Sequence, residues 1–595
     1  MKWMKKLDKQ VVYAMVLYLL GIVVIQDIVL GEFVWKMKLQ DFISAFVVSL
    51  VLYVWNFHRS IILAYLGLTF FMSSILLIQA FHHIAIAFTA LHVMINSSSL
   101  LACVLISIYH FSDFNWIGKN KGNRVVLGFL FFIFYLIPLT YWAYWAMSGQ
   151  VLQADIVLAI CQTNVSETVA YLRSQGILSI VILFVCTIIY IMGTVALTRF
   201  MPNTAVAKQV SKKKVTLGLC AVFYLLSIAS FAHISRASEP IVMFKSIKKS
   251  LDSYKQYGLN KALREKRLQA MTGLSVNPKN KGVYVLVIGE SETREHMGVY
   301  GYKRNTTPWL NELSKEKNTL VFSKAFSNHT HTVPALTYAL SEKNQYNHLN
   351  LDDANSIIEI AKAAGMKTYW ISNQQKYGAW DTPIAEIAST ADYQVWVNGS
   401  VGESTNTLYF DERLAGQIPD IKNLDNALIV FHVMGCHGFY GDRYPDAYDV
   451  FSGDDSVVDM YDNAVLYDDF VLSKLFNDVK QSPNLKAFIM FSDHGEDADS
   501  HKSHESSKFI PVMSKIPLII NFSDSYVADH QSLVDTLHMH KDSPWTNDLM
   551  YNLLISIMGI EGAPVQESQF DLGSPSYNRN LDNLRTLHGK KKLSL

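Results

Sequence analysis

The chain is poor in cysteine and carries almost no net charge. Only five cysteines occur in 595 residues, and Cys436 is the only one after residue 240. The second half of the chain therefore cannot form an internal disulfide, and the sequence has no C-x-x-C motif for zinc or redox chemistry. The formal net charge of +1 gives no reason to expect a nucleic-acid partner.

Apolar residues are abundant but unevenly distributed along the chain. They form 50% of the sequence, and the mean hydropathy of +0.16 is high for a soluble protein. Long apolar runs dominate before about residue 235, whereas the pattern after about residue 240 is that of an ordinary α/β protein. This contrast predicts a polytopic α-helical membrane domain of about seven helices at residues 1–234 and an α/β domain at residues 281–595. The segment between them, residues 235–280, has the pattern of linker helices.

The apolar runs of the first part are near the roughly 20 residues that a membrane-spanning helix needs. The first run is long and lacks a small-residue cleavage site, so we do not interpret it as a cleaved signal peptide. Lysine and arginine cluster at the N-terminus, at residues 119–124 and at residues 199–214, which predicts that these segments are cytoplasmic. Residues 149–176 and everything after about residue 235 then lie on the outer face, which is the periplasm in a bacterium. The candidate spans are Val11–Leu30, Phe42–Trp55, Ile61–Gln79, Ile84–Phe111, Val125–Ala146, Ile177–Leu197 and Val215–Ile234.

Two polar segments adjoin these apolar runs. The outer loop contains C-Q-T-N-V-S-E-T at residues 161–168, which offers an amide, hydroxyls and a carboxylate. It is either a helix capped by Ser166 or Asn164, or a polar cup for a lipid head group. The lysine-rich linker at residues 235–280 shows helical spacing of apolar residues, so it either lies on the lipid surface or is a solvated linker.

Strands and helices alternate after residue 281. This alternation predicts a mostly parallel sheet with helices on both faces. We expect strands at Val283–Ile288, Thr319–Phe322, Lys367–Ile371, Ala427–Val433, Lys486–Phe491 and Pro517–Ile520, with helices including Asp353–Ala364 and Val457–Lys480.

Two of these strands are followed by residues of the types that commonly bind metals. The first strand is followed by Gly289 and Glu290, and the strand at Lys486–Phe491 is followed by Ser492, Asp493 and His494. Open α/β sheets place their chemistry at the carboxyl ends of strands. Each stretch alone is compatible with a strand and a solvated loop. Together, one glutamate, one aspartate and one histidine form a ligand set that zinc or manganese accepts.

A threonine between these strands is a candidate nucleophile. Thr332 precedes Val333 and Pro334, and proline favours the first turn of a helix, so Thr332 lies at or near a helix N-terminus. Free backbone N–H groups at that position stabilise phosphate oxygens, and a metal would turn the hydroxyl into a nucleophile. A simple helix cap is the alternative role, and Thr330 is the rival nucleophile.

Two further histidines are candidate ligands of a metal or a phosphate. His437 comes after the strand at Ala427–Val433, and His501 follows Asp493 and His494 closely. They could hold a second metal or a phosphate, or they could be ordinary surface histidines.

The motifs together resemble the phosphoethanolamine transferases of Gram-negative envelopes, within the alkaline phosphatase/sulfatase superfamily. The matching segments are V-L-V-I-G-E-S-E-T-R-E-H-M-G-V-Y-G-Y-K-R-N-T-T-P-W-L at residues 285–310, T-Y-W-I-S-N-Q-Q at 368–375, G-C-H at 435–437, Y-D-N-A-V-L-Y-D-D-F at 461–470, F-S-D-H-G-E at 491–496 and the loop Q-T-N-V-S-E at 162–167.

The resemblance implies a five-span inner-membrane domain joined to a periplasmic catalytic domain. It also implies transfer of phosphoethanolamine from phosphatidylethanolamine to lipid A, to a lipopolysaccharide core sugar or to another envelope glycan. By resemblance, the nucleophilic threonine, Glu290, Asp493 and His494 bind zinc, and His437 and His501 bind phosphate or a second zinc. The residues that would meet the lipid head group are Thr163, Asn164 and Glu167.

The sequence departs from the family in several ways. Seven expected spans exceed the family's five, and the disulfides of lipid A-specific members cannot form, which favours the core or glycan branch. A phosphoglycerol transferase or a sulfatase-like phosphodiesterase on the same scaffold remains an alternative. A formylglycine sulfatase is disfavoured because T-V-P-A-L lacks the arginine of the C/S-x-P-S-R motif. The alternative from another class is a catalytically inactive membrane sensor.

Overall fold

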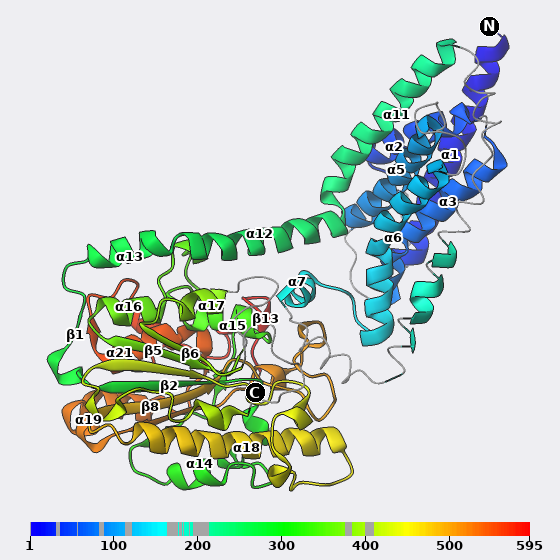
Figure 1. Cartoon of the computed structure of the whole chain (residues 1–595). Helices are drawn as coiled ribbons and strands as arrows, with labels where there is room; N and C mark the ends of the chain where they lie inside the picture. The colour runs from blue at the N-terminus through cyan, green and yellow to red at the C-terminus, as the bar shows by residue number, and fades with distance from the viewer. Residues whose placement is uncertain are drawn as a thin grey trace. The chain divides into compact units, whose positions relative to one another are not determined.

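The computed structural model describes residues 2–30, 36–55, 57–81, 88–112, 122–162, 177, 181–182, 184–189, 191–193, 214–374, 383–398 and 410–594 (Figure 1). The chain divides into two compact units. The first contains Met1–Ala154 and Gln175–Lys248, and the second contains Asp155–Ser174 and Lys249–Leu595. A short segment from within the apolar part of the sequence therefore belongs with the C-terminal unit.

The first unit is helical. Within the described residues, three helical stretches are long and apolar enough to cross a membrane by length and composition: Lys9–Val29, Arg59–Ala80 and Thr89–Ile108. Shorter apolar helices include Leu39–Val54 and Ala221–Ala237. The number of spans stays a prediction, because much of the expected span Ile177–Leu197 lies outside the described residues. The elements are α1 (Lys2–Leu30), α2 (Leu39–Val54), α3 (Arg59–Ser73), α4 (Ile75–Phe81), α5 (Phe88–Ser112), α6 (Gly122–Ser148) and α11 (Lys214–Ile234).

The expected span Ile61–Gln79 is divided between α3 and α4. The Ser73 hydroxyl donates to the carbonyl of Thr69 over 2.7 Å, and the Ser74 hydroxyl donates to that of Phe71 over 2.6 Å. Serine hydroxyls that bond to carbonyls of the preceding turn compete with the helical backbone. The helix is therefore interrupted at these two serines.

The second unit is built on a seven-stranded sheet with the order β3-β9-β8-β2-β7-β5-β6. Neighbouring strands are parallel from β8 to β6, whereas β9 runs antiparallel to both β8 and β3. The apolar helices and this mostly parallel sheet confirm the fold class expected from the sequence. The strands are β2 (Val283–Gly289), β3 (Thr319–Val321), β5 (Lys367–Ser372), β6 (Tyr393–Trp396), β7 (Ala427–His432), β8 (Leu485–Ser492) and β9 (Leu518–Phe522).

Helices cover both faces of this sheet (Figure 1). They are α14 (Pro308–Leu313), α15 (Thr332–Ala339), α16 (Ile357–Ala363), α17 (Pro383–Ala388), α18 (Ser456–Val479), α19 (Asp524–Asp529), α20 (Gln531–Met539) and α21 (Met550–Met558). Two-residue strands pair outside the main sheet: β1 (Ser275–Val276) with β11 (Ile560–Glu561), β4 (Ala325–Phe326) with β10 (Trp545–Thr546), and β12 (Arg585–Thr586) with β13 (Lys591–Lys592).

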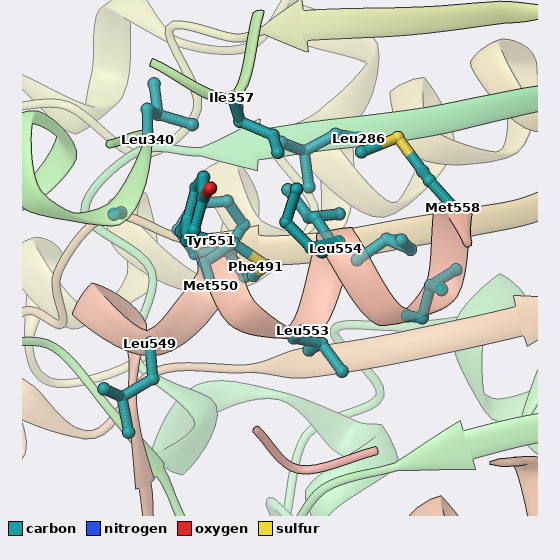
Figure 2. Packing of buried hydrophobic residues seen from close by; sticks show 14 of the residues in the cluster. Leu286, Leu340, Ile357, Phe491, Leu549, Met550, Tyr551, Leu553, Leu554 and Met558 are labelled. Carbon is teal, nitrogen blue, oxygen red and sulfur yellow. The ribbon is translucent and has the colours of Figure 1, made fainter. Parts of the chain in front are cut away.

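Strand β2 lies between two hydrophobic cores, and all of its seven residues are buried. Its even-numbered side chains, such as Leu286, join the core formed with α16 and α21 (Figure 2). Its odd-numbered side chains, such as Val285, join the core formed with α18 on the opposite face. Successive side chains of a strand point to opposite faces, so a continuous apolar run is what a strand buried on both sides requires.

The helix starts follow from local capping. The Ser356 hydroxyl accepts a hydrogen bond from the Glu359 backbone N–H over 3.2 Å, and the Glu359 carboxylate accepts one from the Ser356 N–H over 2.8 Å. This capping box makes α16 begin at Ile357, four residues later than the expected Asp353. The Asp455 carboxylate caps the start of α18 by accepting hydrogen bonds from the N–H groups of Val457 and Val458.

Two helices lead into the second unit, α12 (Glu239–Leu259) and α13 (Lys261–Gln269). Arg264 of α13 is buried, and its guanidinium Nε lies 3.0 Å from the Glu359 carboxylate. It also lies over the Tyr257 ring at 3.8 Å and donates to the Tyr257 carbonyl. This buried contact fixes α13 against α16.

Candidate metal centre

The register of the central strands brings two carboxylates together. In the parallel pair of β2 and β8, Gly289 lies opposite Ser492, so Glu290 and Asp493 leave the sheet side by side. The next residue, Ser291, has a φ of +59°, and its N–H donates to Asp493 Oδ1 over 3.0 Å. A left-handed turn of this kind is costly for a serine, and it aims both acids at one point.

His494 completes a set of three donors. One ligand atom each from Glu290, Asp493 and His494 lies within 4.8 Å of the other two. His494 Nε2 lies 3.4 Å from Glu290 Oε1 and 3.4 Å from Asp493 Oδ2. Its Nδ1 lies 3.0 Å from the Gly495 carbonyl, which can only accept, so Nδ1 carries the hydrogen. Nε2 is therefore the ring atom that faces the carboxylates, which is the position of the donor atom in a histidine that binds a metal.

The residues fit a divalent cation. Asp493 Oδ2 and His494 Nε2 are buried and have no hydrogen-bond partner among the described residues. A buried polar atom without a partner costs about 1–3 kcal/mol, so two at one point indicate that a further group belongs there. Two carboxylates and an imidazole are ligands that zinc accepts in tetrahedral sites, and a threonine oxygen is available as the fourth.

The electrostatics of this cluster favour a positive charge at its centre. Burial and the charge of Glu290 raise the pKa of Asp493 to about 7. Burial alone would lower the pKa of His494, but the charges of Asp493 and Glu290 outweigh it and raise that pKa to about 10. For Glu290, the contact with His494 outweighs burial and holds the pKa below its usual range. Two buried carboxylates this close repel each other unless a cation lies between them.

Thr332 lies at this cluster. It is the first residue of α15, and its Oγ1 lies 3.3 Å and 3.2 Å from the two carboxylate oxygens of Glu290. The hydroxyl therefore donates to Glu290. Thr330 is buried, and its Oγ1 makes no hydrogen bond within the described part of the chain. The structure thus brings together Glu290, Thr332, Asp493 and His494.

A second group of possible ligands adjoins the first. Donor atoms of His494, Glu496 and His504 lie within 4.8 Å of one another. His504 Nδ1 lies 2.7 Å from the Glu496 carboxylate, which also accepts from the Tyr440 hydroxyl. Burial alone would raise the pKa of Glu496, but His504 outweighs it and lowers the pKa. Both groups share His494, so they form one continuous site.

The two histidines expected here take different positions. The rings of His437 and His504 are 6.4 Å apart, so His437 lies at the edge of the second group. His501 is more than half exposed, and its Nε2 lies 2.8 Å from Asp455, the cap of α18. The structure thus brings His504 to the site and places His501 on Asp455. Thr163, Asn164 and Glu167 lie outside the described residues.

Comparison with known proteins finds relatives of this domain. The sulfatase family model matches residues 283–555, which contain both groups of ligands. The match therefore covers most of the C-terminal α/β domain. The integral membrane protein lipooligosaccharide phosphoethanolamine transferase A from Neisseria meningitidis shares the fold of the chain, with a TM-score of 0.55 at 16% identity over 86% of this chain and 98% of that chain.

Two curated relatives are phosphoethanolamine transferases. EptC of Escherichia coli (strain K12) is 32% identical over 266 residues, which cover 41% of this chain and 46% of that protein. CptA of Salmonella typhimurium (strain LT2) is 28% identical over 432 residues, which cover 64% of this chain and 71% of that protein. The match to EptC thus spans about half of that protein's length. The resemblance to phosphoethanolamine transferases seen in the motifs is confirmed.

A glycine closes the candidate metal centre from the side of β7. Gly435 has a φ of +48°, and a Cβ there would lie 2.9 Å from the Glu290 carbonyl oxygen and 3.0 Å from its nitrogen. The next residue, Cys436, donates its N–H to the Glu290 carbonyl over 2.9 Å. The loop that carries His437 therefore packs directly on the backbone of Glu290, and only glycine allows this approach.

Sequence reasoning missed three residues of the candidate metal centre. Glu496 ends the motif F-S-D-H-G-E, and a glutamate beside two expected ligands was a usable signal. His504 stands three residues after His501 in the same loop, and the sequence pattern does not distinguish the two. His331 precedes Thr332, and its ring centre lies 5.8 Å from that of His504. Burial, followed by the charges of His504 and His494, lowers the pKa of His331 well below its usual value.

Proposed function

We propose that this chain is a zinc-dependent phosphoethanolamine transferase. It would move phosphoethanolamine from phosphatidylethanolamine to an envelope glycolipid or glycan, through a covalent intermediate on Thr332. The observation that carries the proposal is the Thr332 hydroxyl, which lies against Glu290 in a buried set of metal-binding donors. The similarity to phosphoethanolamine transferases supports the choice of the transferred group.

Glu290, Asp493, His494 and Thr332 would hold the zinc ion. A bound zinc ion supplies Lewis acidity, which lowers the pKa of a hydroxyl and offsets the charge of a phosphate. The donor set also contains the atoms that manganese accepts, so metal identity is part of the test.

The chain's own residues prepare Thr332 for attack. Glu290 accepts the hydrogen bond from Thr332 Oγ1 and orients its lone pairs. Thr332 begins α15, whose first N–H groups favour the oxygens of a phosphate. His437 and His504 at the edge of the site can donate to the same oxygens, which carry the developing charge.

The proposed reaction has two displacements. In the first, Thr332 Oγ bonds to the donor phosphorus, the bond to the diacylglycerol oxygen breaks, and the threonine proton ends on diacylglycerol. In the second, an acceptor hydroxyl or phosphate oxygen bonds to phosphorus, the bond to Thr332 Oγ breaks, and the hydroxyl is restored. Splitting one transfer into two steps is the usual gain of nucleophilic catalysis.

The membrane location is part of the proposal. The apolar helices would anchor the chain in a bacterial inner membrane, with the catalytic domain in the periplasm. Phosphatidylethanolamine is itself a membrane lipid, so the anchor would bring the active site to its donor. The proposed head-group contacts are Thr163, Asn164 and Glu167, and the acceptor would be lipid A, a lipopolysaccharide core sugar or another envelope glycan.

The test is direct labelling of the enzyme. Detergent-purified protein is incubated with fluorescent phosphatidylethanolamine and zinc, and its intact mass is measured. We expect a gain of one phosphoethanolamine with release of diacylglycerol. The gain should be lost in Thr332→Ala and after removal of zinc by a chelator.

Thr330→Ala is the matched control, because Thr330 lies two residues away and makes no hydrogen bond to Glu290 within the described part of the chain. Label that survives in Thr332→Ala and disappears in Thr330→Ala would move the nucleophile. Label from phosphatidylglycerol in place of phosphatidylethanolamine would show a phosphoglycerol transferase. No label from either lipid would contradict the proposal and favour a non-catalytic sensor.

A further inference from the structure

A hydrogen-bonded chain links α7 to the start of the nucleophile helix. Asp155 is the second residue of helix α7 (Ala154–Gln162), and the segment from Asp155 belongs to the same compact unit as the C-terminal α/β domain. The Ser506 hydroxyl donates to Asp155 Oδ2 over 2.8 Å, and Ser506 Oγ lies 3.2 Å from His331 Nε2. His331 immediately precedes Thr332.

The number of available hydrogens fixes the direction of these two hydrogen bonds. A serine hydroxyl has one hydrogen, and the Asp155 carboxylate can only accept it. The contact between Ser506 and His331 must then use a hydrogen on His331 Nε2, with the Ser506 oxygen as acceptor. The Asp155 carboxylate therefore sets both the orientation of the Ser506 hydroxyl and the tautomer of the His331 ring.

Burial of the Asp155 carboxylate has an energetic cost that a solvent-exposed helix cap would not have. Its Oδ1 is buried and has no hydrogen-bond partner among the described residues. Ser506 is also buried, at 4% exposure, and the neighbouring Ile156 of α7 is buried at 6%. A half-satisfied carboxylate in such surroundings calls for an explanation beyond stability, because an apolar residue would avoid the penalty.

We propose that Asp155 is a positioning residue for the transfer reaction: through Ser506 it holds His331, and thereby the N-terminus of α15 and the Thr332 hydroxyl. The segment that follows α7 in the sequence carries Thr163, Asn164 and Glu167, the residues proposed to meet the donor. This inference rests on the proposed function for its kinetic readout.

The first measurement is the rate of Thr332 labelling in the full-length protein. Asp155→Ala and Ser506→Ala should each lower the maximal labelling rate constant about tenfold, because the nucleophile is misplaced. The phosphatidylethanolamine concentration that gives half of this rate should change less than about twofold. The double variant should be no slower than the slower single variant, since both substitutions break one chain of contacts. Asp155→Asn should retain most activity, because the amide oxygen still accepts from Ser506.

Gln153→Ala is the matched control, because Gln153 is exposed and lies two residues before Asp155. It should label at the wild-type rate. In Asp155→Ala, a raised half-saturating concentration of phosphatidylethanolamine with an unchanged maximal labelling rate constant would overturn the proposal and indicate direct contact with the donor. Additive losses in the double variant would overturn it as well.

A second measurement does not depend on the transferase activity. Hydrogen–deuterium exchange is followed at residues 328–336 of the full-length protein without lipid. Asp155→Ala should exchange several-fold faster than wild type and Gln153→Ala should not. Equal exchange in all three proteins would contradict the positioning role. Absence of labelling in wild type, with faster exchange in Asp155→Ala, would reject the proposed function and keep the anchoring of α15.

Discussion

At Gly435 the loop after β7 touches the backbone of a proposed metal ligand, with a φ that favours glycine. Gly435→Ala should therefore displace either Glu290 or the loop that carries His437. We expect loss of most bound zinc and at least a tenfold loss of labelling, from strain of about 1–3 kcal/mol. Metal analysis of the purified variant checks this. Gly301→Ala is the control, because Gly301 has a φ of +93° but no atom within 4 Å of its Cβ position, and it should keep its zinc.

Glu342 should make the stability of the domain depend on pH. It is buried at 3% exposure, and burial raises its pKa from 4.5 to about 7, although it accepts hydrogen bonds from Asn355. The folded state therefore binds this proton more tightly than the unfolded state does. The contribution to stability is fully present below about pH 4.5 and is lost as pH rises to about 7, by up to about 3 kcal/mol.

Glu342→Gln removes this titration and keeps the shape of the side chain. The variant should melt several degrees above wild type at pH 8 and close to wild type at pH 5. Asn355 Oδ1 has no hydrogen-bond partner in the described ranges, so it can accept from the new amide. A Tm difference that is the same at both pH values would contradict the assignment of the shift to Glu342.

The candidate site shows what single residues reveal before a structure is known. Glu290, Asp493 and His494 could be predicted as neighbours because each follows an apolar strand, and parallel strands share one edge. His504 could not be separated from His501 in this way. In the loop that carries both histidines, the chain makes left-handed turns at His501 (φ +56°) and Ser503 (φ +56°). Such turns depend on local contacts, including that of Asp455 with His501, and have no periodic signature in the sequence.

At the scale of elements, α13 is anchored by one buried ion pair. Arg264→Met would leave the Glu359 carboxylate buried without its partner, which is strongly destabilising, at about 3 kcal/mol or more. Thermal unfolding of the full chain checks this. Arg267→Met is the control on the same helix, because the Arg267–Asp353 pair is about half exposed and should contribute less than about 1 kcal/mol. Equal losses in the two variants would contradict the anchoring role of Arg264.

Strands buried on both faces were predictable from sequence, and edge strands were less so. β2, β7 and β8 are continuous apolar runs, and the structure has them within two residues of the expected bounds. β6 was missed because Tyr393–Trp396 is a four-residue edge strand whose residues are only partly buried or exposed. The antiparallel direction of β9 could not be predicted either, because a buried apolar run has the same sequence pattern in parallel and antiparallel pairing.

At the scale of the whole molecule, the C-terminal domain carries its own cores. Among the described residues, the two hydrophobic clusters of the second unit consist of residues from Tyr257 onward. A fragment of residues 249–595 should therefore fold, keep the α/β circular dichroism of the domain and bind zinc. It lacks residues 155–174, which belong to the same unit. The fragment thus separates a folded metal site from a complete active site.

With a short-chain, water-soluble phosphatidylethanolamine as donor, the fragment no longer needs a membrane anchor to meet its substrate. We still expect it to label Thr332 at least tenfold more slowly than the full chain in the same detergent, because Asp155 and the proposed head-group loop are missing. Full-length Asp155→Ala should lie between the two, since it loses the anchor of α15 but keeps the loop. Equal rates for fragment and full chain would show that residues 249–595 hold all the groups that the first displacement requires.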